Sequence, residues 1–191
     1  MKKVFYFILL ILVTVSCSDK NRQGGIAEKG KMQADIVQLY AQIDSMRHQG
    51  VVNFELSNQF IEKALLLLKD YPEDDLSLEM LLRAGDFSTL LARNVKDFQP
   101  DNKTLMVQYA NQSIKIFDEI QRVYPDREEA KKVYYNRAIV YDDILGDYDS
   151  AKYEYYEFIN RFPNDSISSM LKHYVDHSLG KTPEEILASF E

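Results

Sequence analysis

Apolar residues recur every three or four positions from about residue 31 onward, as they do along one face of an α-helix. The stretches with this spacing are residues 32–46, 56–71, 76–91, 106–124, 130–141, 148–162 and 167–175. Two capping boxes are expected, Asp126 with Glu129 before the fifth helix and Thr182 with Glu185 before a short eighth helix. No stretch alternates like an exposed strand, so the sequence predicts an all-α domain.

Three of these helices end on the same signal, an aromatic residue followed by a proline and then by an acidic or amide residue. The signals begin at Tyr71, Tyr124 and Phe162. Proline ends a helix because it lacks the amide hydrogen that continues the hydrogen-bond ladder. The signals close the second, fourth and sixth helices, and short connections favour antiparallel hairpins. The sequence therefore predicts a helix pair as the repeating unit.

The third pair, "YYNRAIVYDDILGDYDSAKYEYYEFINRFPND", resembles a tetratricopeptide repeat. Aromatic, small and closing-proline positions of that family are matched by Tyr134, Ala138, Tyr141, Ala151, Tyr155, Phe158 and Pro163. The turn "DDILGD" is one residue longer than the family's consensus. The two earlier pairs keep only the spacing of the second helix, so the resemblance covers roughly residues 31 to 163 with one clear repeat and two degenerate ones.

The resemblance implies a helical-hairpin repeat, a tetratricopeptide-like α-solenoid of about three degenerate helix pairs with capping helices at the C-terminal end. It also implies a concave groove lined by the first helix of each pair. Lys132, Tyr135, Ile139 and Asp142 are expected to face this groove. Tyrosine suits such a surface because it buries a large area and keeps a polar group. An exposed tyrosine on a charged helix is the alternative for Tyr135.

The first sixteen residues read as a secretory signal: Lys2 and Lys3 precede an apolar stretch that is too short to span a bilayer. "VTVSC" resembles a bacterial lipoprotein signal, which implies that Cys17, the only cysteine, carries a lipid such as palmitate and becomes the mature N-terminus. Several acyl chains anchor a protein stably where one does not. We expect a signal peptide over 1–16, a lipidated flexible tether over 17–30, and a helical domain over 31–191.

The charge balance bears on the partner. The chain has 23 Lys and Arg residues, 30 Asp and Glu residues and a formal net charge of −7, without a basic run. Because nucleic-acid binding depends on clustered cations, no nucleic acid is expected. "FDEIQRVYPD" and "YEFINRFPND" resemble the repeats of envelope lipoproteins, notably the BamD-type outer-membrane assembly lipoproteins. That resemblance implies the outer membrane as location, with the periplasmic or surface face left open.

No recognised catalytic set is present. The chain lacks a nucleophile elbow and a glycine-rich phosphate loop. His173 and His177 share a helical face, but no third metal ligand accompanies them, so we expect no metal, no cofactor and no small-molecule substrate. The expected function is a non-enzymatic, membrane-anchored adaptor that binds a protein or peptide in its groove. The alternatives are a rigid accessory subunit of an assembly or export complex and, last, an enzyme.

Overall fold

The computed structural model describes the backbone of residues 2–188 and the side chains of residues 25–182 and 184–188. Over this part of the chain it is all-α, as predicted, with eight α-helices and no strand. The helices are α1 (Lys2–His48), α2 (Phe54–Asp70), α3 (Asp75–Phe98), α4 (Lys103–Val123), α5 (Lys132–Ile139), α6 (Tyr148–Arg161), α7 (Ser168–His177) and α8 (Pro183–Ala188). A 3₁₀ segment, η1 (Glu128–Lys131), precedes α5, and a π-helix, η2 (Val140–Leu145), continues it.

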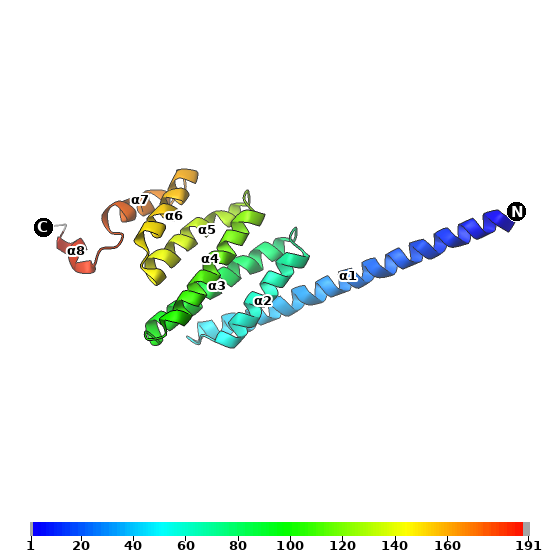
Figure 1. Cartoon of the computed structure of the whole chain (residues 1–191), viewed down its shortest axis with the longest axis horizontal. Coiled ribbons are helices and arrows are strands. Elements are labelled where there is room, and N and C mark those ends of the chain that lie inside the picture. The colour runs from blue at the N-terminus through cyan, green and yellow to red at the C-terminus, as the bar shows by residue number, and fades with distance from the viewer. Residues whose placement is uncertain (1, 189–191) are drawn as a thin grey trace.

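Consecutive helices pack side by side and run in alternating directions, so that α2 to α7 form a row of hairpins (Figure 1). The most extensive packing joins α3 to α4. The C-terminal part of α1 packs against α2, whereas its N-terminal part extends away from the other helices (Figure 1).

Four helices end with the same backbone geometry directly before a proline. The C-cap residues are Tyr71, Gln99, Tyr124 and Phe162, with φ between −139° and −126° and ψ between 51° and 60°. These angles lie outside the α-helical region, which a following proline disfavours for the residue before it. In each case the carbonyl of this residue accepts a hydrogen bond from the amide three positions later. Three of these four ends were predicted. The fourth, at the end of α3, was not predicted. This backbone geometry before a proline is therefore not restricted to the second helix of each pair.

The turns that follow α2, α4 and α6 are connected to one another or to a neighbouring helix along one edge of the molecule. The contacts are Lys29–Asp74 at 2.5 Å, the Tyr124 hydroxyl to the Pro72 carbonyl at 2.6 Å, Arg127–Asp75 at 2.7 Å and Lys131–Asp165 at 2.7 Å. The turns that follow the three proline signals thus end a helix and also contact a neighbouring turn or helix.

Residues 25–30, which were predicted to belong to a flexible tether, are helical in the structure. Residues 25–30 continue α1 as helix, although two glycines cost about 1 kcal/mol each relative to alanine in a helix. Lys29 already contacts the body, since its ammonium pairs with Asp74 and lies 5.3 Å from the ring centroid of Tyr71. The packed domain therefore begins slightly before residue 31. The predicted signal peptide and Cys17 lie outside the residues whose side chains the structure describes.

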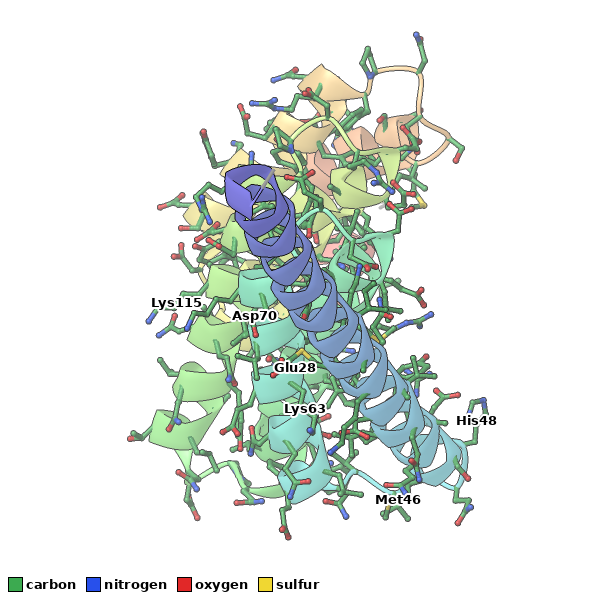
Figure 2. All side chains as sticks on the ribbon, turned by 90° about the vertical axis from the view of Figure 1, so that its right-hand side faces the viewer. Glu28, Met46, His48, Lys63, Asp70 and Lys115 are labelled. Atoms are coloured by element: carbon green, nitrogen blue, oxygen red, sulfur yellow. The ribbon has the colours of Figure 1, made fainter. Side chains whose placement is uncertain are left out.

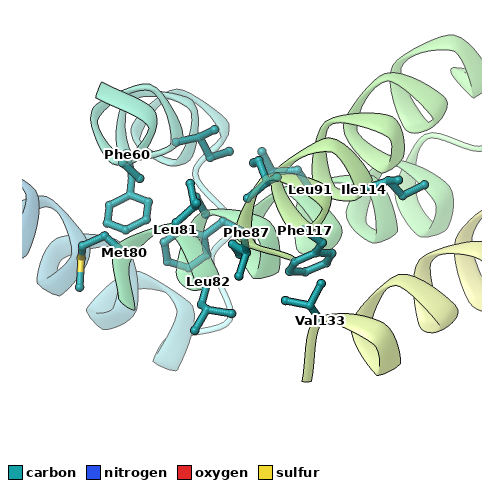
Figure 3. Packing of buried hydrophobic residues seen from close by; sticks show 14 of the residues in the cluster. Phe60, Met80, Leu81, Leu82, Phe87, Leu91, Ile114, Phe117 and Val133 are labelled. Carbon is teal, nitrogen blue, oxygen red and sulfur yellow. The ribbon is translucent and has the colours of Figure 1, made fainter. Parts of the chain in front are cut away.

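The buried side chains form two clusters. The larger lies among α1 to α4 and is completed by Ala130, Val133, Val140 and Ile144. In it Phe60 and Phe87 meet with ring centroids 5.1 Å apart (Figure 3). The smaller lies among α5, α6 and α7 and contains Tyr134, Ala138, Ala151, Tyr155, Phe158, Leu171 and Val175. The signature alanines of the third pair are both fully buried, as the close approach of two helices requires.

The extra residue of "DDILGD" is absorbed by a π-helix. A π-helix accommodates one residue more than an α-helix within a turn. Here η2 continues α5 without a cap and ends at Gly146, whose φ of 66° is in the left-handed region. The longer segment is therefore accommodated within the helix, and the turn into α6 consists of Gly146 and Asp147.

Of the two predicted capping boxes, one is confirmed. The Thr182 amide donates to Glu185 and the Glu185 amide donates to the Thr182 hydroxyl. The box at Asp126 and Glu129 is wrong, because η1 begins after Arg127 without a side-chain cap and Glu129 pairs with Arg127 instead.

Candidate functional site

The first helices of the predicted pairs share one face of the molecule, which we call the odd-helix face. It is formed by α1, α3, α5 with its continuation η2, and α7. Its polar or partly exposed side chains are Tyr40, Arg47, Arg83, Asp86, Arg93, Lys132, Tyr135, Asn136, Ile139, Asp142, Asp143 and Tyr174. Contacts run directly from one odd-numbered helix to the next. The guanidinium of Arg83 lies 4.7 Å from the Tyr40 ring centroid, and Asn136 donates to Asp86 at 3.1 Å.

Asp86 occupies the middle of this face and is accessible yet partly desolvated. Its side chain reaches solvent, but desolvation by the surrounding helices raises the pKa of its carboxyl. Lys132, Arg83 and Arg47, which belong to α5, α3 and α1, oppose that effect. Asp86 is therefore an exposed carboxylate with cationic side chains from three helices near it.

The predicted groove residues have different environments. Lys132 is exposed and has no ion pair at contact distance among the described side chains, and Ile139 is partly exposed. Tyr135 is partly buried beside Tyr155, with ring centroids 6.3 Å apart. Lys132 and Ile139 are therefore available to a ligand, whereas Tyr135 already packs against the smaller cluster.

Asp142 holds the smaller cluster together. Its Oδ2 accepts hydrogen bonds from the hydroxyls of Tyr174 at 2.6 Å and Tyr155 at 3.2 Å. Burial, followed by this carboxylate, raises the pKa of both phenols well above the ordinary value, so both remain protonated donors. An alanine at position 142 would remove an internal contact, and it is therefore unsuitable as a test of ligand binding.

The neighbouring acid in the π-helix points to a different helix. Asp143 accepts from Arg93 at 2.6 and 2.9 Å, and Lys96 of α3 donates to its carbonyl. The two adjacent carboxylates thus join η2 to α3 on one side and to α6 and α7 on the other. Neighbours in sequence diverge on a helix, so these acids do not form a catalytic pair.

A buried arginine joins three helices and was not predicted. Arg137 of α5 is 7% exposed and donates to Asp118 at 2.6 Å and Gln121 at 2.8 Å of α4, and to Glu154 of α6 at 2.7 Å. Burial raises the pKa of Glu154, and the arginine opposes that effect. The charged positions inside the apolar stripes of "YYNRAIVY" and "AKYEYYEF" were the available signal. The two terminal nitrogens of Arg137 are committed to these partners, whereas its buried Nε has no hydrogen-bond partner among the described residues. The contacts join α4, α5 and α6, so we assign the group a structural role.

Comparisons of this chain with family models, with curated proteins and with solved structures give no match. No family is shown. The resemblance to tetratricopeptide repeats therefore remains a prediction carried by the residues quoted above.

The histidine pair is brought together as expected for one helical face. The rings of His173 and His177 have centroids 4.6 Å apart. Within residues 25–182 and 184–188, no group of three or more His, Cys, Asp or Glu side chains is placed to hold a metal ion. In the described part of the chain, none of the helices has the length and apolar character needed to cross a membrane.

Proposed function

We propose that the protein is a membrane-anchored adaptor of the cell envelope that holds a protein or an extended peptide on its odd-helix face. The proposal combines the lipoprotein-like leader with a helical-repeat domain of the tetratricopeptide type. The observation that carries it is the direct side-chain contact of α1 with α3, of α3 with α5, and of η2, which continues α5, with α7. These contacts bring exposed charged side chains of alternate helices together.

The chemistry of the face suits a polar, extended partner. Asp86 and Lys132 supply opposite charges close together, and Ile139 supplies a partly exposed apolar side chain on the same helix as Lys132. Such a surface can bind a partner chain that carries complementary charges and hydrogen-bonding groups. Nothing in the arrangement calls for bond breaking, so the proposed role is binding alone.

Photocrosslinking from two positions tests the binding face. A photoreactive phenylalanine at Ile139 of α5 is expected to give discrete adducts with envelope proteins in cells, because a ligand on this face would contact it. The matched control replaces Tyr153, which is exposed on α6 outside the odd-helix face. Identical adducts from both positions, or none from position 139, would contradict the proposed face.

The proposed anchor has its own test. Changing Cys17 to serine is expected to release the protein from the membrane fraction, because the thiol that would take the lipid is gone. Fractionation and palmitate labelling measure this directly. Palmitate incorporation that continues unchanged in the serine variant would rule out lipidation at this residue.

A second candidate is a rigid accessory subunit of an outer-membrane assembly or export complex, which docks through the opposite face. The observation that favours it is the exposure of Leu65 and Leu66 on α2, outside the odd-helix face. Photocrosslinks from position 66 instead of position 139 would support this second candidate.

A further inference from the structure

The even-numbered helices carry a groove of different character from the odd-helix face. Between α2 and α4 lie two adjoining hollows of about 560 and 670 Å³, which share Leu65 and Glu119. We call this the α2–α4 groove; its apolar lining is Leu65, Leu68, Ile116 and Val123. Gln108, Asn111, Gln112 and Glu119 also line it, and its rim includes Lys69 and Lys115, the latter labelled in Figure 2. The helices are tied together near its two ends, by Asn58 with Tyr109 at 3.0 Å and by Tyr124 with Pro72 at 2.6 Å.

The groove has an apolar floor with polar side chains beside it, and two uncommitted cations border it. Leu65 is 38% exposed and its neighbour Leu66 is 44% exposed. Neither Lys69 nor Lys115 has a carboxylate at contact distance among the described side chains, whereas Arg122 beside them is paired with Glu119. In a chain of net charge −7 this combination fits an acidic segment with an apolar side chain.

The chain itself contains such a segment. The six-residue helix α8 lies at the end of the molecule beyond α7 and has no extended packing against another helix (Figure 1). Its Leu187 is 68% exposed, and Glu184 and Glu185 stand in its first turn. Isolated helices of this length are marginal in water, so the Thr182–Glu185 box alone does not account for the stability of α8.

We propose that α8 of one copy docks in the α2–α4 groove of a second copy. Leu187 would fill the apolar floor beside Leu65, and the acidic first turn would face Lys69 and Lys115. Residues 108–123 along α4 span about 22 Å, which exceeds the roughly 9 Å of α8. Figure 1 places α8 at the end of the body opposite α1 and α2, so the contact joins different copies and is head-to-tail. It is independent of the odd-helix face.

A directed disulfide between two differently tagged full-length chains tests the contact. Both chains carry Cys17→Ser, which leaves the introduced thiols alone; one carries Leu187→Cys and the other Leu65→Cys. Oxidation of the mixture in detergent is expected to give a mixed covalent dimer. The matched control moves the second cysteine to the exposed Phe98 at the end of α3. Equal dimer from positions 65 and 98, or no mixed dimer from position 65, overturns the proposal.

Charge reversal separates this occupant from others. Lys69→Glu with Lys115→Glu is expected to lower the yield of mixed dimer about five- to twentyfold, as exposed ion pairs allow. Glu184→Lys in the partner chain, which leaves the Thr182–Glu185 box intact, should then restore part of the yield. A mixed dimer that is insensitive to both reversals, or that forms equally well with Leu187→Cys replaced by Met170→Cys on α7, would show that another surface fills the groove.

Discussion

Replacement of Arg137 by methionine is expected to lower the free energy of unfolding by about 3–5 kcal/mol near neutral pH. The change removes the guanidinium that Asp118, Gln121 and Glu154 share. Asp118 is largely solvated, but Glu154 is buried at the junction of α4, α5 and α6 and would be left charged without a partner. Urea unfolding followed by circular dichroism measures the loss.

The loss is expected to depend on pH in a defined direction. Burial already raises the pKa of Glu154 in the folded protein, so the folded state holds this proton more tightly than the unfolded state. The corresponding contribution to stability is present below the unfolded pKa and is lost as pH rises through the folded pKa. Without Arg137 the pKa rises further, and the variant should therefore lose less stability at about pH 5 than at pH 7.5.

Two variants make the arginine experiment specific. Arg161→Met removes an exposed ion pair with Glu157 on α6, and its effect should stay below about 1 kcal/mol. Arg137→Met combined with Glu154→Leu removes both buried charges, and it should recover much of the loss. A loss that is independent of pH, or a double variant that is less stable than Arg137→Met, would contradict the role given to Glu154.

Replacement of Gly85 by alanine is expected to destabilise the protein by about 1–3 kcal/mol, although alanine favours helices over glycine by about 1 kcal/mol. A Cβ at this position would lie 2.3 Å from Cε1 of Phe117, whose side chain is fully buried in the larger cluster. The ring cannot move aside without disturbing the α3–α4 packing. Urea unfolding measures the change.

The matched control for Gly85 is another helical glycine. A Cβ at Gly30 in α1 would meet no atom within 4 Å, so Gly30→Ala should be neutral or stabilising by up to about 1 kcal/mol. The two alanine substitutions are thus expected to have opposite signs. Equal stabilisation by both would show that helix α4 can shift to accept a methyl group at position 85.

The sequence predicted the helices well because their signals are local. Hydrophobic spacing found every helix from α2 to α7, and three of the four proline stops were recognised from their aromatic residues. The fourth, at Gln99, was missed because its side chain is not aromatic, although its backbone geometry matches the others. The backbone geometry depends on the proline that follows, so the aromatic residue reports packing and not the stop itself.

The candidate site was predicted less well because its environment depends on contacts between distant residues. Lys132, Tyr135 and Ile139 lie on α5 and Asp142 lies on η2, and their role in binding a ligand stays a prediction. The two tyrosines that donate to Asp142 lie 13 and 32 residues away in sequence. The partners of Arg137 are 16 to 19 residues away. A helical periodicity shows which side of a helix is polar. It does not show which residues of other helices contact that side.

The placement of α5 between the two clusters limits how the protein can be divided. Val133 belongs to the larger cluster and its immediate neighbour Tyr134 to the smaller, so one short helix seals both. A chain cut before α5 would leave each fragment with an open apolar face, and a chain cut after η2 would leave α6 and α7 without the surface that orders them. Removal of α7 alone, by contrast, would open only the smaller cluster, through the loss of Leu171 and Val175.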